Sequence, residues 1–435
     1  MLQLIKTPAV SISSQIKMAR TFFLLVNVLL CVHHICLSKT CRAEEEEKPS
    51  RYLFVFGDST VDSGPKKDHE TGMRAGHSPY GIECQWYGKF RFTNGWTVPD
   101  MIALKLNLTV PVSSVEVKLF PRYNGVNYAS ASAGILPETG TALGTNYCME
   151  KQVGFFKETL EKFLRPKFPS PEELSKRLSD SIFVINIGSS DYIFNYLQPS
   201  DYNSSRQYSG DAFAELLITK LGNHLEDLYN LGARKMLIFE IGPLGCLPYI
   251  INKFNPRERC FEDANKLASI FNEKLETKLK ELSGKLNGST FATAKTFHLI
   301  KDIVENPFDY GLQETRWPCC ATQENGTGLC KEPKIHYMSP ETIAKLRPTD
   351  PSYYEKQFRR DYFCTRSPPP PKVTRPRTSI GKPEGDVCED REAFVFWDEL
   401  HLTAAVNRII MDKCFHPASG GICSPYDIYQ LANQR

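Results

Sequence analysis

The sequence predicts an α/β fold with a parallel sheet, because short apolar runs alternate with amphipathic segments from Arg51 onward. The runs have the length of buried strands, and the segments between them follow the 3.6-residue period of helices. Connections of this length join parallel strands whose two faces are both covered by helices. With 435 residues, 41% of them hydrophobic, the chain can bury a large core. We expect one large domain over residues 44–435.

Four apolar runs are the expected strands: residues 52–56, 181–187, 235–241 and 290–294. The residues directly after each strand are of interest, because ligands of such sheets bind beyond the carboxyl ends of the strands. Ser59 comes after the first run and Ser190 after the second. Both are therefore expected at the ligand-binding edge.

Two helices are predicted by apolar residues that recur every three or four positions. One stripe runs from Phe213 to Leu228 and ends at Gly232, a residue type typical of helix C-termini. The other runs from Leu267 to Leu282 and ends at Gly284. Each is expected to pack one face against the sheet.

The N-terminus is typical of a secretory signal peptide, which we place at residues 1–43. Basic residues precede an apolar run over residues 22–32, and small residues come after it up to Ala43. Met18 is an alternative start that gives a shorter signal. The run is short of the ~20 residues that span a bilayer, so no integral membrane segment is expected after cleavage. The alternative is a helix that anchors or buries this tail.

The cysteines favour disulfides over a metal site. Fourteen cysteines are typical of a secreted protein, and neither paired CxxC nor Cys/His metal spacing occurs. They cluster as Cys246 with Cys260, Cys319 and Cys320 with Cys330, and Cys364, Cys388, Cys414 and Cys423. Their connectivity cannot be deduced from spacing. Four glycosylation sequons fit the same extracellular location: Asn107, Asn203, Asn287 and Asn325.

Charge and composition exclude one class of partner and mark one insertion. The formal charge of +3 comes from 53 basic and 50 acidic residues, without a basic stripe, so nucleic acid is not an expected partner. Residues 331–386 contain a proline run and then basic residues, which predicts an extended linker that packs no core. The alternative is a polyproline ligand for an aromatic groove.

Ser59, Asp398 and His401 are the candidate catalytic residues. Asp398 precedes His401 by three positions, so one helical turn would place both on the same face. An imidazole oriented by a carboxylate is the base that a serine nucleophile requires. The alternative is a turn serine, a helix cap and a surface histidine without catalytic roles.

Several blocks of the sequence resemble the plant GDSL esterase/lipase family, a branch of the SGNH hydrolases. The likeness extends from about Arg51 to Ile422, apart from the proline-rich segment. The blocks are FGDSTVDSG at 56–64, PYG at 79–81, RFTNG at 91–95, GVNYAS at 125–130, IGPLGCLP at 241–248, and FVFWD at 394–398 leading to His401. The chain lacks the GxSxG motif of other serine hydrolases.

The resemblance implies a flavodoxin-like three-layer α/β/α domain with a parallel sheet. It implies a nucleophile at Ser59, a general base at His401 and an orienting carboxylate at Asp398, without a metal or an organic cofactor. The expected partner is a small-molecule or lipid ester, and the oligomeric state is left open. The resemblance implies three donors for the oxyanion: the N–H of Ser59, an N–H near Ser132, and a side chain at Ser190.

Two of these three donors depart from the family pattern. The family usually has glycine at one of the positions held by Ala131 and Ser132. A residue with a side chain is tolerated there if the local φ is negative. It has asparagine where this chain has Ser190, whose side chain is shorter. The sequence thus predicts a secreted serine esterase or lipase that hydrolyses acyl esters, with weakened activity. The alternatives are an inactive binding protein and an acyltransferase that uses the same triad.

Overall fold

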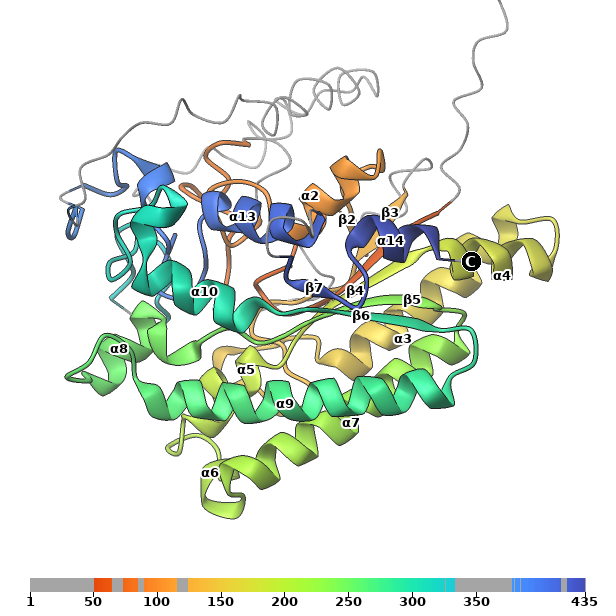
Figure 1. Cartoon of the computed structure of the whole chain (residues 1–435), viewed down its shortest axis with the longest axis horizontal. Helices are drawn as coiled ribbons and strands as arrows, with labels where there is room; N and C mark the ends of the chain where they lie inside the picture. The colour runs from red at the N-terminus through yellow and green to blue at the C-terminus, as the bar shows by residue number, and fades with distance from the viewer. Residues whose placement is uncertain are drawn as a thin grey trace, which may run out of the picture. The chain divides into compact units, whose positions relative to one another are not determined.

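Seven strands form one sheet in the order β2-β3-β1-β4-β5-β6-β7 (Figure 1). The computed structural model describes residues 51–64, 73–84, 90–115, 124–324, 326–332, 378, 380–383, 385–415 and 421–434. The expected signal peptide, Asn325 and most of the 331–386 segment lie outside these residues. The strands are β1 (Leu53–Gly57), β2 (Val112–Ser113), β3 (Gly125–Asn127), β4 (Ile182–Asn186), β5 (Lys235–Phe239), β6 (Thr290–Ala294) and β7 (Cys423–Ser424).

All neighbouring strands pair in parallel except β6 and β7, which are antiparallel. The predicted α/β class is therefore confirmed, and the sheet is mixed at one edge rather than wholly parallel. Without the two short outer strands, the order β3-β1-β4-β5-β6 has the flavodoxin-like pattern of five parallel strands. The order reverses between β1 and β4, and ligands of such sheets bind at this point.

Helices cover both faces of the sheet. Successive residues of a strand point to opposite faces, so each strand contributes side chains to two separate cores. Phe54 and Phe56 of β1 pack in the core beneath α3, α4, α7 and α9. Leu53 and Val55 pack in a second core beneath α2, α10, α13 and α14. The expected three-layer arrangement is confirmed by these two cores. The helices are α2 (Val98–Lys105), α3 (Met149–Thr159), α4 (Pro171–Asp180), α5 (Ser189–Asp191), α6 (Ser204–Gln207), α7 (Gly210–Asn230), α8 (Pro248–Phe254), α9 (Glu262–Lys285), α10 (Thr296–Glu305), α13 (Ala404–Phe415) and α14 (Ile428–Asn433).

The two predicted helices correspond to α7 and α9, which lie against each other (Figure 1). Gly232 comes just after α7 with a φ of +110°, as expected for a residue that ends a helix. Gly284 does not end α9, which continues to Lys285. Within the described residues, no helix combines the length and the apolar character needed to cross a membrane.

Four disulfides are present among the described residues, as the cysteine content predicts. They are Cys246–Cys260, Cys319–Cys388, Cys320–Cys330 and Cys414–Cys423. Cys319–Cys388 joins two of the groups that the sequence separates. Cys364 lies outside the described residues. Cys84 and Cys148 are buried and belong to none of these four bonds. The Cys319–Cys388 disulfide closes the base of the segment that contains the proline run, and Cys388 N–H also donates to Cys319 O over 2.7 Å. The described residues on either side of this segment are therefore joined to each other.

Candidate active site

The loop after β1 is held rigidly by its backbone contacts. A Cβ atom at Gly57 would lie 2.2 Å from the Asn186 carbonyl oxygen, so only glycine permits this approach of β1 to β4. The buried Gln152 side chain pairs with both backbone groups of Gly57, over 2.8 Å each. Asp58 N–H donates to Asn186 O over 3.1 Å. These contacts fix Ser59 at the carboxyl end of β1, where the sequence places it.

Asp398 and His401 lie in a bend between Phe396 and α13, not in a helix. The expected helical turn is therefore wrong, although the two side chains do meet. The Asp398 carboxylate stabilises this bend, because its Oδ1 accepts hydrogen bonds from the N–H groups of Leu400 and His401 over 2.8 Å each. Trp397 N–H closes the bend by donating to His401 O over 2.7 Å.

Ser59, His401 and Asp398 form a continuous hydrogen-bonded chain. His401 Nε2 lies 2.7 Å from Ser59 Oγ, and His401 Nδ1 lies 2.8 Å and 2.9 Å from the two oxygens of Asp398. All three side chains are buried, and Asp398 has no exposed surface. The carboxylate directs a proton to Nδ1, which leaves Nε2 free to accept the hydroxyl proton of Ser59.

Two aromatic residues support this chain, and reasoning from the sequence did not assign them a role. The Phe92 ring packs against the His401 imidazole with centroids 4.8 Å apart. The Tyr80 hydroxyl donates to Asp398 Oδ2 over 2.7 Å and accepts the Cys330 N–H over 3.0 Å. Both residues belong to blocks that carry the family resemblance, PYG and RFTNG, which was the signal available. These contacts join residues at least 250 positions apart, so the spacing of residues in the sequence did not reveal them.

The backbone N–H groups of Ser59 and Ser132 donate to no protein acceptor within the described structure. Ser132 lies in the loop after β3, and its neighbour Ser130 donates its N–H to Gly57 O over 3.0 Å. The two loops are therefore adjacent. Unpartnered buried N–H groups are rare in proteins and are typical of anion-binding positions.

Ser132 has a φ of +57°, which is the left-handed region that favours glycine. The condition under which a side chain is readily tolerated here, a negative φ, is therefore not met. The fold keeps the backbone conformation of a glycine and accepts a strain of about 1–2 kcal/mol. Asn146 Nδ2 donates to both Ser132 O and Ser132 Oγ over 3.3 Å each, and these bonds help to hold the loop.

Ser190 lies at the start of the segment after β4 and lines the same cavity as Ser59 and His401. Its hydroxyl has no protein partner within the described residues, so it is available to donate. Ser132 does not line this cavity in the described structure. The structure thus brings Ser59 and Ser190 to one cavity and leaves Ser132 on the adjoining loop.

The neighbouring Asp191 ties these loops together. Its fully buried carboxylate accepts the N–H of Ile135 over 2.8 Å, the N–H of Leu136 over 3.1 Å and the Thr139 hydroxyl over 2.7 Å. Burial raises the pKa of Asp191 to about 7, although these donors lower it. Burial also raises the pKa of Asp58, whose Oδ1 accepts from Thr60 while Oδ2 has no partner within the described residues.

The cavity beside the triad has mainly apolar walls. They are formed by side chains from several elements, including Phe92, Phe194, Phe239, Leu244, Ile300 and Phe396. An apolar pocket with a few convergent polar groups is the usual form of a small-molecule site. The described residues contain no cluster of three or more His, Cys, Asp or Glu side chains that could hold a metal ion.

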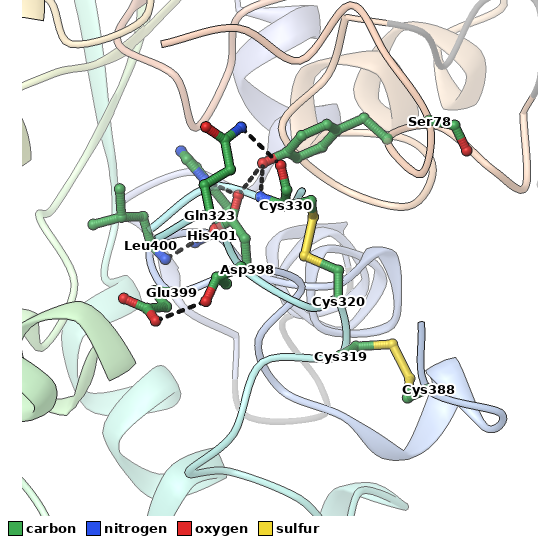
Figure 2. The surroundings of a disulfide bond; sticks show 12 residues. Ser78, Cys319, Cys320, Gln323, Cys330, Cys388, Asp398, Glu399, Leu400 and His401 are labelled. Atoms are coloured by element: carbon green, nitrogen blue, oxygen red, sulfur yellow. Dashed lines mark hydrogen bonds and ion pairs between the residues drawn. A yellow bond between two sulfur atoms is a disulfide. The ribbon is translucent and has the colours of Figure 1, made fainter. Parts of the chain in front are cut away.

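The loop closed by Cys320–Cys330 wraps around the bend that carries Asp398 and His401. Figure 2 shows this disulfide beside Asp398, with Cys319–Cys388 next to it. Cys320 N–H donates to Trp397 O over 2.9 Å, and Glu399 N–H donates to Gly328 O over 2.9 Å. The loop closed by the Cys320–Cys330 disulfide therefore contacts the bend on both sides of Asp398.

Comparison with known proteins identifies the family. A sequence profile of the GDSL-like lipase/acylhydrolase family matches residues 53–414. GDSL esterase/lipase 7 of Arabidopsis thaliana is 36% identical over 388 residues, which cover 87% of this chain and 91% of that protein. GDSL esterase/lipase At2g19060 of the same plant is 31% identical over 384 residues, or 87% of this chain and 90% of that protein. The chain belongs to the GDSL esterase/lipase family, which indicates hydrolysis of ester bonds.

Proposed function

We propose that the protein is a secreted serine esterase that hydrolyses carboxylic esters through an acyl-serine intermediate on Ser59. The observation that carries this proposal is the 2.7 Å contact between Ser59 Oγ and His401 Nε2, with Asp398 on the other ring nitrogen. A hydroxyl, a base and an orienting carboxylate in this order form the serine-hydrolase constellation.

Ser59 Oγ attacks the ester carbonyl carbon while its proton passes to His401 Nε2. The tetrahedral intermediate then expels the alkoxide, which takes that proton and leaves as the alcohol. Water attacks the acyl-serine next and gives one proton to Nε2. The bond to Ser59 then breaks to release the carboxylic acid, and Nε2 returns the proton to Ser59 Oγ. Asp398 stabilises the imidazolium that is present in each step.

The developing oxyanion has three candidate donors. The N–H groups of Ser59 and Ser132 are unpartnered within the described structure. Ser190 lines the same cavity as Ser59, whereas Ser132 lies on the adjoining loop. A serine hydroxyl reaches less far than the asparagine amide of the family pattern. The oxyanion hole formed by these donors therefore has one well-aligned donor fewer. We therefore expect an active enzyme with modest turnover.

The substrate class is inferred from the cavity. Its apolar walls suit the acyl chain or the apolar alcohol of a small-molecule or lipid ester. Secretion is supported by the four disulfides and by the apolar run at residues 22–32. Asn107, Asn203 and Asn287 are exposed, as glycosylation requires.

Hydrolysis of a short-chain nitrophenyl ester tests the proposal. The purified mature protein should release nitrophenol, and Ser59→Ala should remove the activity while the fold is retained. Equal rates for the two proteins would refute the proposal. Product analysis with and without an added alcohol separates hydrolysis from acyl transfer, because both routes share the acyl-serine.

A further inference from the structure

The Tyr80 hydroxyl connects Asp398 with the disulfide-closed loop. Tyr80 is buried, with 3% of its surface exposed, and its hydroxyl lies 2.7 Å from Asp398 Oδ2 and 3.0 Å from the Cys330 backbone nitrogen. These contacts bridge 318 and 250 residues of sequence. No step of the proposed reaction uses Tyr80 directly.

The polarity of this bridge is fixed by its chemistry. A backbone N–H can only donate, so the Tyr80 oxygen accepts from Cys330 and its single proton points to Asp398. Burial, and after it the nearby charge of Asp398, raises the pKa of Tyr80 well above its usual value. The phenol therefore remains a donor over the whole working range of pH.

This donor is the contact that anchors Asp398 from outside its own bend. The other donors to the carboxylate among the described residues are the backbone N–H groups of Leu400 and His401 and the His401 imidazole, all within three residues. The backbone donors both reach Oδ1, whereas Tyr80 reaches Oδ2. Tyr80 thus limits rotation of the carboxylate about its Cβ–Cγ bond.

We propose that Tyr80 is a positioning residue, held by the Cys330 N–H, that fixes the Asp398 carboxylate and so the orientation and basicity of His401. This inference rests on the proposed esterase function. By donating a hydrogen bond to Asp398, Tyr80 draws on part of the carboxylate charge that would otherwise stabilise the imidazolium. The hydroxyl therefore affects how strongly Asp398 stabilises a proton on the imidazole, a property on which general-base catalysis depends.

The charged and titratable groups around His401 come from three parts of the chain. Asp398 contacts the imidazole directly, and Tyr80 contacts Asp398. The charge of Asp58, in the loop after β1, interacts with His401, and the charge of Glu399 interacts with Asp398. A change confined to Tyr80 leaves these other groups in place, so their effects on His401 are the same in the wild type and in the variant.

Tyr80→Phe tests the proposal, since it removes the hydroxyl and keeps the ring that packs 5.7 Å from Phe92. We expect kcat to fall on the order of 10- to 100-fold, the usual effect of losing a hydrogen bond to a charged group, while KM changes less than about twofold. The acid limb of the kcat/KM profile should move to higher pH, because Asp398 then holds more charge next to His401. A purely structural role would lower stability without moving this limb.

Tyr192→Phe is the matched control. Tyr192 is fully buried, and its hydroxyl has no hydrogen-bond partner in the described structure. Its removal should leave kcat and the pH profile unchanged. If Tyr80→Phe behaves like this control while the wild type is active, the proposal is overturned.

Two further measurements test the proposal if the kinetic comparison cannot be made. An NMR titration of His401 needs no turnover: a higher pKa in Tyr80→Phe than in the wild type supports the proposal, and equal pKa values overturn it. Absence of ester cleavage by the wild type would instead refute the esterase function. Should Tyr80→Phe not fold, 3-fluorotyrosine at position 80 makes the phenol a stronger donor. It should move the acid limb to lower pH, and an unmoved limb overturns the proposal.

Discussion

The Cys330 backbone N–H donates to the Tyr80 hydroxyl over 3.0 Å, although 250 residues separate the two in the chain. Through this contact the disulfide-closed loop of residues 320–330 reaches Asp398, which accepts from Tyr80. The position of one backbone N–H is thus linked to the carboxylate that orients His401. The stability of that loop should therefore affect catalysis as well as folding.

Two disulfides of nearly equal loop length allow this to be tested. Cys320–Cys330 and Cys414–Cys423 span 10 and 9 residues, so each should contribute a similar stability of about 2–3 kcal/mol. Replacing Cys320 and Cys330 by serine should lower kcat of the folded protein on the order of tenfold, because the Cys330 N–H is no longer held. Replacing Cys414 and Cys423 should lower only the melting temperature. Equal kcat in both double variants would argue against the link.

Ser190→Asn should raise turnover. An asparagine amide reaches farther than the serine hydroxyl, and one oxyanion donor is typically worth about 10²–10³ in kcat. We expect a gain on the order of 10², with Ser190→Ala about tenfold below the wild type. Steady-state kinetics with a nitrophenyl ester measures this order, Asn above Ser above Ala. If no variant has any activity, the binding-protein alternative is favoured, and equal rates for all three would exclude Ser190 from the oxyanion hole.

Stability should fall as pH rises from about 4 to about 7. Burial raises the pKa of Asp191 to about 7, so the folded state holds a proton that the unfolded state has already released in this range. The free energy of unfolding should therefore decrease over this pH range, by an amount on the order of a few kcal/mol. Burial raises the pKa values of Asp58, Glu240 and Glu399 in the same direction.

Chemical denaturation at several pH values measures this dependence. Asp191→Asn lowers stability at every pH, because an amide cannot accept all the bonds that tie residues 135–139 to the segment after β4. The informative quantity is the slope, which should be smaller in this variant than in the wild type between about pH 4 and 7. An unchanged slope would show that Asp191 does not titrate in this range.

The central strands and two long helices could be predicted because their apolar patterns are long and regular. The run at residues 290–294 coincides with β6, and the stripe from Phe213 lies within α7. Strands β2, β3 and β7 have only two or three residues each, so they carry no period to recognise. The antiparallel pairing of β7 depends on contacts with β6 that no local pattern encodes.

The meeting of Ser59 and Ser190 at one cavity was predictable from topology, because polar residues after parallel strands gather at one edge. The pairing of Ser59 with His401 rested instead on the family resemblance, since His401 lies in a bend and does not come after a parallel strand. The conformation around Asp398 was not predictable, since a spacing of three residues fits a bend as well as a helix. The positive φ of Ser132 and the contact of Tyr80 with Asp398 were also beyond reach. Both depend on the folded surroundings rather than on the neighbouring residues.

Labelling with a fluorophosphonate, with peptide mapping of the product, tests the central claim most directly. The reagent reacts only with a serine hydroxyl that a neighbouring base activates, so it reports the Ser59–His401 contact without a known substrate. We predict one label per chain on Ser59, which His401→Ala and Ser59→Ala both remove. A folded protein that takes up no label, or that takes it up on a different serine, would contradict the assignment of Ser59 as the nucleophile.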